Sequence, residues 1–180
     1  MNDYIRTYSG IHFYPLAPVK EDINIGDIAH SLSLMTRANG HLAHFYSVAQ
    51  HSINCGREAM ARGLSARIAL AGLLHDASES YLSDLTRPVK KHFKNYYDIE
   101  EKLQRMIYEA FDLDGLSQEE EEIVREIDDT MLYHEFRSIM NYRIFDTEPP
   151  LAMPDDFVEK NFRQVEEEFL ALFHVWKGGA

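Results

Sequence analysis

A short stretch in the middle of the chain carries the residue types of a metal site. His75 and Asp76 end an apolar run over residues 68–74, and Glu79 follows four residues after His75. A helix this apolar should be buried on most of its circumference, so a His and an Asp at its end must be hydrogen-bonded, ion-paired or bound to a cation. On a helix His75 and Glu79 share a face, and Asp76 is turned by about 100°. The spacing predicts half of a metal site with its acid/base residue; the alternative is a His–Asp hydrogen bond beside a solvated Glu79.

Two further candidates for metal ligands lie elsewhere in the chain. Ser47 and Gln50 have the spacing of a capping box, which predicts a helix that begins there, carries His51 in its first turns and stops near Gly63. Asp128 borders the apolar stripe of a later predicted helix, where a buried cation could hold a carboxylate. A lone helical His is more often a core or surface residue than a metal ligand. His51 and Asp128 are therefore candidates only if side chains from other elements join them at one site.

The chain has one basic cluster, and it follows the His75–Asp76 stretch directly. Pro88 is tolerated in the first turn of a short helix, and it keeps the residue before it out of helical geometry. Next to a metal ion these cations would suit contacts to phosphate, whereas elsewhere they would form a solvated basic face. The cluster comprises Arg87, Lys90, Lys91 and Lys94.

The remaining patterns place helices around these residues. Residues 4–16 are rich in aromatic and β-branched residues around Ser9-Gly10, which predicts a small β-hairpin. A helix over 28–35 could be capped by Asp27, and the helix that Ser65 caps is expected to carry the His75–Asp76 stretch to about Leu82. Other helices are predicted at 96–112, from Ser117 onward through a second capping box, and from about Asp155 to Trp176.

Composition limits the class of protein. The 180 residues, with 45% hydrophobic and 27% charged residues, are typical of one globular domain. A net charge of −12 argues against binding to a nucleic acid polymer or an anionic membrane. The single cysteine, Cys55, excludes an intramolecular disulfide, fits a reducing compartment and is expected to fill apolar space. No apolar run reaches the ~18 residues of a membrane span and no signal peptide is evident, so a cytoplasmic location is expected.

The candidate ligands follow one another in the order His51, His75-Asp76, Asp128, on three predicted helices. This order resembles the signature of the HD-domain metal-dependent phosphohydrolases, over about Thr7 to Arg137. Within that superfamily the chain is similar to the small bacterial and prophage-borne 5′-deoxynucleotidases. The matching motifs are Gly40-His41, the Phe-Tyr-Ser-Val-Ala-Gln-His-Ser run at 45–52, the Leu-His-Asp-Ala-Ser-Glu run at 74–79, Asp84-Leu85, Pro88-Val89-Lys90, and Asp128 with Met131-Leu132 and Glu135.

The resemblance implies a fold and a metal. The fold would be an all-α helical bundle of five or more helices, one HD domain over 1–180, with a hairpin and loop at about 4–26, a helical core at about 27–142 and a C-terminal helix at about 155–176. One divalent transition metal, Co, Mn, Zn, Ni or Fe, suits His and carboxylate ligands better than Ca²⁺ or Mg²⁺ does. Its implied ligands are His51, His75, Asp76 and Asp128.

The resemblance also assigns roles around the metal. Glu79 would orient or deprotonate the attacking water or protonate the leaving oxygen, and Asp84 would assist or contact the sugar. Arg37 would hold phosphate, Lys90 would lie near the phosphate tail, and Pro88 would pack on the base. Some relatives carry a large aromatic residue directly after that arginine, which crowds the sugar and disfavours ribonucleotides. This chain has Ala38 there, so His41, His44 or Phe45 would have to fill the space.

Three functions are compatible with these residues. The preferred one is the release of phosphate from deoxynucleoside 5′-monophosphates. The alternative is removal of triphosphate from a deoxynucleoside triphosphate such as dATP, and the second alternative is a non-catalytic nucleotide-sensing HD module. The partner in each case is a small nucleotide. Members of the family are commonly dimers, so a homodimer or higher homo-oligomer is compatible with the sequence, although no motif identifies an interface.

Overall fold

The computed structural model describes residues 3–179, apart from the side chain of Lys94, and it is mostly helical. The predicted N-terminal hairpin is confirmed as two short antiparallel strands, β1 (Ile5–Arg6) and β2 (His12–Phe13), with Ile5 opposite Phe13. The helices in chain order are η1 (Lys20–Asp22), α1 (Ile25–Leu34), η2 (Arg37–Gly40), α2 (Val48–Ala61), α3 (Ala66–Leu74), α4 (Glu79–Leu82), α5 (Arg87–Lys90), α6 (Lys94–Ala110), α7 (Gln118–Met140) and α8 (Phe162–Gly179).

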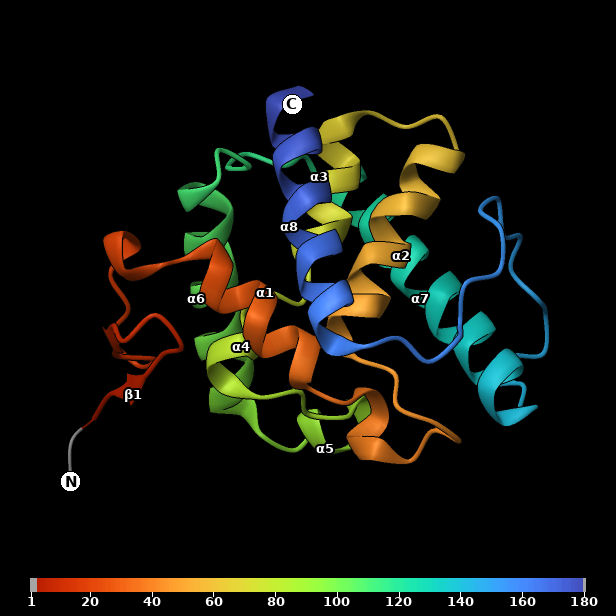
Figure 1. The fold of residues 1–180 in the computed structure, drawn as a ribbon, viewed down its shortest axis with the longest axis horizontal. Helices are drawn as coiled ribbons and strands as arrows, with labels where there is room; N and C mark the ends of the chain where they lie inside the picture. The colour runs from red at the N-terminus through yellow and green to blue at the C-terminus, as the bar shows by residue number, and fades with distance from the viewer. Residues whose placement is uncertain (1–2, 180) are drawn as a thin grey trace.

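The helices form one core in which α2, α3 and α8 pack together. In Figure 1 α8 crosses in front of α3, α2 lies beside them, α7 contacts α2 from behind, and α1 crosses below. Gly56 on α2 allows this close approach, because a Cβ there would fall 2.4 Å from Cζ3 of Trp176 and 2.9 Å from the carbonyl oxygen of Ala69. Within residues 3–179 no helix has both the length and the apolar character needed to cross a membrane.

Two of the predicted helix starts are confirmed by their side-chain caps. Ser47 accepts a hydrogen bond from the Gln50 amide while Gln50 Oε1 accepts one from the Ser47 amide, so the capping box at the start of α2 is complete. Ser117 and Glu120 form the same pair at the start of α7. These two helices carry His51 and Asp128, so local capping determines where both candidate ligands sit along their helices.

Asp27 does not cap α1, and that prediction is wrong. The cap is Asn24, whose Oδ1 accepts hydrogen bonds from the amides of Gly26 and Asp27, so α1 begins at Ile25. The buried Asp27 carboxylate instead accepts hydrogen bonds from the amide and the hydroxyl of Ser9, at 2.6 and 2.7 Å. Its role is therefore to fasten the N-terminal hairpin to α1.

The C-terminal helix begins at Phe162, and the predicted start at about Asp155 is wrong. The carbonyl oxygens of the preceding segment accept hydrogen bonds from side chains on and before α2, which hold that segment against α2 in a non-helical conformation. The Asn161 side chain accepts a hydrogen bond from the amide of Arg163 and sets the start of α8. The donor–acceptor pairs are Asn54 to Asp156, His44 to Phe157 and Gln50 to Val158.

A buried carboxylate on α2 holds the segment between α7 and α8. Glu58 is fully buried, and it accepts hydrogen bonds from the backbone amides of Ala152 and Met153 at 3.0 and 2.9 Å and from Nε of Arg62 at 2.8 Å. Removing this carboxylate would leave two backbone amides and Nε of Arg62 without their acceptor, although the other guanidinium nitrogens would keep Glu126 and Thr130.

We expect Glu58→Ala to lower the free energy of unfolding by about 3 kcal/mol, because buried donors lose a charged acceptor. Urea denaturation followed by circular dichroism measures this loss. The control is Glu126→Ala, which removes the exposed second acceptor of Arg62 and should cost about 0.5 kcal/mol or less. Equal losses in the two variants would show that the Glu58 carboxylate does not anchor this segment.

Candidate metal centre

The helix that carries the His-Asp pair is interrupted at that pair, so the prediction of one helix continuing to about Leu82 is wrong. Gln104 of α6 inserts its amide at the break, donating from Nε2 to the Leu74 carbonyl oxygen at 2.7 Å and accepting at Oε1 from the Ser78 amide at 3.0 Å. In a regular helix those two backbone groups would bond to each other. His75 and Asp76 therefore lie on a tight turn between α3 and α4.

Four side chains predicted as metal ligands converge at this turn. His51 Nε2, from α2, lies 3.2 Å from His75 Nε2, 3.1 Å from Oδ1 of Asp128 on α7, and 3.8 Å from Oδ2 of Asp76. His75 Nε2 lies 3.3 Å from Asp76 Oδ2 and 3.8 Å from Asp128 Oδ1. Residues from three separate parts of the chain thus direct their donor atoms at one point.

Hydrogen bonds orient both imidazoles toward this point. His51 Nδ1 lies 2.7 Å from Oε1 of Glu135, and His75 Nδ1 lies 2.7 Å from the carbonyl oxygen of Gly72. Since both partners are acceptors, each Nδ1 carries a proton and, in a neutral ring, each Nε2 presents its lone pair. Two lone pairs 3.2 Å apart need a proton or a cation between them. Metal-ligating histidines are held by partners of this kind.

The spacing fits the ligand shell of a single transition-metal ion. Bonds of about 2.0–2.1 Å place neighbouring donor atoms about 3.0 Å apart at right angles and about 3.4 Å apart at the tetrahedral angle. The five distances above run from 3.1 to 3.8 Å. Two imidazoles and two carboxylates also balance the charge of a divalent cation, so donor types, spacing and charge all suit such an ion.

The electrostatics of the cluster favour positive charge at its centre. Burial and Arg37 lower the pKa of His51, but Cys55, Glu135 and Asp128 raise it by more. The net result is a pKa well above the usual value of histidine. Burial raises the pKa of Asp128, but hydrogen bonds from His51 and His75 outweigh it and hold that pKa well below its usual value. In the absence of a metal ion, the surrounding carboxylates thus favour protonated imidazoles. The same negative charge would stabilise a bound cation.

Arg37 lies against the same cluster. Its guanidinium is 3.4 Å from Asp76 Oδ2, 3.6 Å from Glu135 Oε2 and 3.9 Å from Asp128 Oδ1, and the side chain is only 12% exposed. Burial lowers the pKa of Arg37, but these carboxylates raise it above its usual value, so the group remains charged. Its shortest contact to a carboxylate is the one to Asp76, and Nη2 also lies 3.2 Å from the ring nitrogens of His51. A guanidinium in this position beside a metal site can bind an anionic oxygen.

The loop that positions Arg37 contains the predicted turn at Asn39-Gly40. Ala38 and Asn39 have φ values of 51° and 52°, and Gly40 has a φ of 75°. His44, one candidate to fill the space beside Ala38, instead bonds the Phe157 carbonyl oxygen, and His41 is exposed.

Glu79 is a buried carboxyl group next to the cluster. It is 3% exposed, its Oε1 lies 3.6 Å from Lys90 Nζ, and its Oε2 has no hydrogen-bond partner within the described part of the chain. Burial, followed by repulsion from Asp76 and Asp84, raises the pKa of Glu79 well above its usual value. A carboxyl group whose pKa is raised in this way holds its proton to higher pH and can donate it to a reacting group.

The other residues predicted to contact the substrate differ in their exposure and partners. Lys90 bonds Glu100 of α6 at 2.6 Å. Burial raises the pKa of the half-buried Asp84 above its usual value. Arg37 and Lys90 lower this pKa, and Asp76 raises it. Pro88 lies in the first turn of α5 and is exposed. Of the basic cluster, Lys91 is exposed, and the side chain of Lys94 lies outside the described part.

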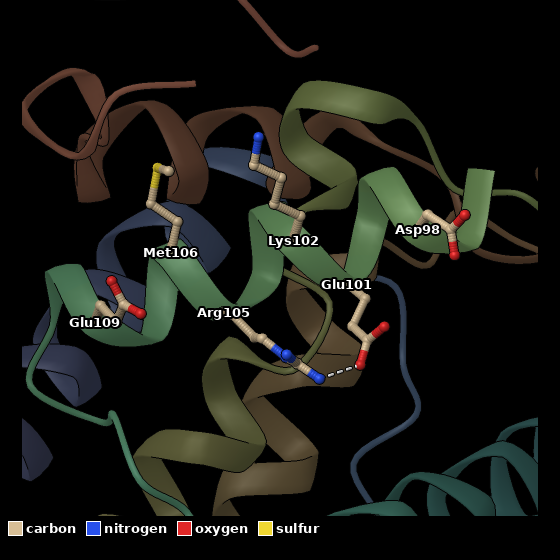
Figure 2. A pocket seen from close by; sticks show the side chains of 6 residues that line it. All are labelled: Asp98, Glu101, Lys102, Arg105, Met106 and Glu109. Carbon is tan, nitrogen blue, oxygen red and sulfur yellow. Dashed lines mark hydrogen bonds and ion pairs between the residues drawn. The ribbon is translucent and has the colours of Figure 1, made fainter. Parts of the chain in front are cut away.

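A cleft of about 460 Å³ opens beside the His75–Asp76 turn and Asp128, with α6 forming one wall. A second hollow, of about 390 Å³, lies along α6, shares Glu101 and Arg105 with the first cleft, and is drawn in Figure 2. Its six lining residues all come from this one helix, with Lys102 and Met106 on one side and the Glu101–Arg105 ion pair on the other. None of the candidate metal ligands lines the second hollow, so the first cleft is the one that gives access to the site.

Two residues near the cluster, Glu135 and Cys55, were not given a site role from the sequence, and Arg87, predicted only as part of a phosphate-binding basic cluster, instead bonds a candidate ligand. Glu135 orients His51, Arg87 donates to Asp128 Oδ2 at 2.6 Å, and Cys55 Sγ lies 3.6 Å from His51 Nε2. His51, Cys55 and His75 together form a group that could hold a metal ion. Helical spacing could have indicated two of them, since Cys55 is one turn after His51 and Glu135 is two turns after Asp128.

The comparisons with known proteins identify similar sequences of unassigned activity. No family model matches this chain. It is 43% identical over 110 residues to the uncharacterized protein YfdR of Escherichia coli, covering 61% of this chain and 59% of that protein. It is 40% identical over 114 residues to an uncharacterized protein of Rhodobacter capsulatus, covering 60% and 58%. The match therefore spans less than two thirds of either curated relative.

Proposed function

We propose that this chain is an HD-domain phosphohydrolase that depends on one divalent transition metal and releases phosphate from deoxynucleoside 5′-monophosphates. The observation that carries the proposal is the convergence of His51, His75, Asp76 and Asp128 beside a buried acid, Glu79, and a cation, Arg37. The four residues whose order along the chain resembles the HD signature thus lie close together in the fold. The predominantly helical fold agrees with this assignment.

Each group has a task in hydrolysis. A divalent cation held by the four ligands would supply Lewis acidity and activate a water molecule. Arg37 would bind phosphate oxygens and hold the phosphorus in line with that water. As the water oxygen bonds to phosphorus and the bond to the 5′-oxygen breaks, Glu79 would give its proton to the leaving oxygen. The leaving group is then a neutral nucleoside.

Hydrogen bonds with neighbouring residues would keep the metal ligands in place. Glu135 fixes the ring of His51, and the Gly72 carbonyl fixes the ring of His75. Arg87 donates to the second oxygen of Asp128, which leaves Oδ1 directed at the two imidazoles. Gln104 maintains the turn that carries His75 and Asp76.

The charge of the cleft supports a monophosphate over a triphosphate substrate. Two of its three basic groups already have carboxylate partners within the same lining, Lys90 with Glu100 and Arg105 with Glu101. A triphosphate carries more negative charge and would meet a lining in which five acids outnumber three bases. The charged lining residues are the acids Asp76, Glu100, Glu101, Glu121 and Asp128 and the bases Lys90, Arg105 and Arg125.

A product assay tests the function and the substrate length together. We expect deoxynucleoside monophosphates, with Co²⁺, Mn²⁺, Zn²⁺, Ni²⁺ or Fe²⁺, to yield nucleoside and orthophosphate in equal amounts, and about tenfold faster than triphosphates react. Chromatography of the nucleoside and a phosphate assay measure both products. Protein treated with a chelator is the control. Tripolyphosphate as the product would identify a triphosphohydrolase, and tight binding without any product would identify a nucleotide sensor.

Matched ribonucleotides extend the same assay to the sugar. Ala38 leaves the position after Arg37 without a large side chain, His41 is exposed, and His44 bonds the Phe157 carbonyl oxygen. We therefore expect the hydrolysis rates of ribonucleoside and deoxyribonucleoside monophosphates to differ less in this protein than they would with an aromatic residue at that position.

A further inference from the structure

Cys55 is turned toward the metal cluster, although the sequence suggested only an apolar filler. It lies one helical turn after His51 on α2 and is 1% exposed. Its Sγ is 3.6 Å from His51 Nε2, and the candidate ligand atoms of His51, Cys55 and His75 all lie within 4.8 Å of one another. The thiol thus faces the nitrogen whose lone pair points at the centre of the cluster.

The distance between the two atoms suits shared coordination. Metal bonds of about 2.3 Å to sulfur and about 2.0–2.1 Å to imidazole nitrogen put the two ligand atoms about 3.1 Å apart at a right angle and about 3.8 Å apart at 120°, the angles of a five-coordinate centre. The observed 3.6 Å lies between these values. The alternative is an S–H hydrogen bond donated to His51. His51 Nε2 also lies 3.2 Å from Arg37 Nη2, which can donate to it, and it lies 3.2 Å from His75 Nε2 and 3.1 Å from Asp128 Oδ1, which are both acceptors. A thiol proton would compete with the Arg37 donor and would serve neither of these acceptors, whereas one cation could be shared by all of them.

We infer that Cys55 is a fifth protein ligand, which gives the centre one sulfur, two nitrogen and two oxygen donors. The inference rests on the metal site of the proposed function, but not on hydrolysis. When the metal–sulfur bond forms, the thiol releases its proton to solvent and no oxidation state changes. Because thiolate is a soft ligand, it would favour Zn²⁺, Co²⁺ or Fe²⁺ over Mn²⁺ and Mg²⁺.

Cobalt spectroscopy tests the sulfur ligand directly. Because Cys55 is the only cysteine in the chain, any thiolate-to-cobalt charge-transfer band in the near ultraviolet must come from it. We expect that band in the Co²⁺-loaded protein, together with the visible d–d bands of bound cobalt. In Cys55→Ser the charge-transfer band should disappear while the d–d bands remain. The control is Ser52→Ala, a similarly small change at a buried position of the same helix, which should keep both sets of bands.

Metal titrations provide a second measurement. Cys55→Ser should weaken Zn²⁺ binding by about tenfold or more and Mn²⁺ binding by less than about threefold. Thermal unfolding of the metal-free variants identifies a folding defect, and Cys55→Ala provides a second substitution should serine perturb the helix. An equal loss for both metals in folded protein would overturn the inference.

The outcomes separate this inference from the proposed function. Visible cobalt bands without the charge-transfer band would overturn the sulfur ligand and leave the hydrolase proposal intact. A charge-transfer band in a protein that hydrolyses no nucleotide would support the ligand and refute the hydrolase. Failure of the unaltered protein to bind Co²⁺ would overturn both.

Discussion

Asp128→Asn is expected to abolish tight metal binding, and with it nucleotide hydrolysis. Asp128 Oδ1 lies 3.1 Å from His51 Nε2 and 3.8 Å from His75 Nε2, and an amide there would neutralise one of the two carboxylates that balance the metal charge. Loss of a direct ligand should exceed the tenfold to hundredfold effect typical of outer contacts, so we expect metal affinity to fall by about a hundredfold or more. Metal content after dialysis and calorimetric titration measure this effect.

The neighbouring residue provides a matched control. Asp129 is on the same helix and bonds Arg87 at 2.6 Å, as Asp128 does, but its side chain is 49% exposed, against 21% for Asp128. Asp129→Asn should change metal affinity by less than about threefold, because an exposed ion pair contributes little. Similar losses in the two variants would indicate that charge around Arg87, and not coordination by Asp128, governs binding.

Glu79→Gln should keep the metal and lower kcat by about a hundredfold to ten-thousandfold, the range for loss of a general acid. Glutamine has nearly the same shape, so the buried position and the neighbouring turn are retained. Burial, the largest cause of the raised pKa of Glu79, persists when a cation is bound. Steady-state kinetics with a deoxynucleoside monophosphate, together with metal content, separate turnover from metal loading.

The pH dependence gives a second readout for Glu79. Because its pKa is raised, the protonated form persists above the usual range of a glutamic acid, and activity should fall as pH rises through that pKa. This decline should be absent from the residual activity of Glu79→Gln. The control is Glu100→Gln, which alters another acid of the same cleft. Full activity in Glu79→Gln would show that Glu79 is not the proton donor.

Local sequence patterns were enough to predict the helical class, the hairpin and several helix starts. Capping boxes at Ser47 and Ser117 depend on residues three apart, and the structure contains both. Apolar periodicity placed α6 and α7 to within a few residues. The four proposed ligands were grouped through a resemblance to known motifs, since spacing along the chain cannot show that side chains from distant helices meet.

The tertiary structure decided how these elements end and which side chains complete the cluster. Gln104 replaces the helical hydrogen bond between Leu74 and Ser78 and so creates the turn that carries His75 and Asp76. Glu135 of α7 turns the ring of His51, so that Nε2 faces His75 and Asp128 from other elements. Each of these contacts depends on the geometry of folded helices, which local propensity does not encode. The sequence by itself therefore determined the helices and the types of candidate donor, whereas tertiary packing determined that the donors converge.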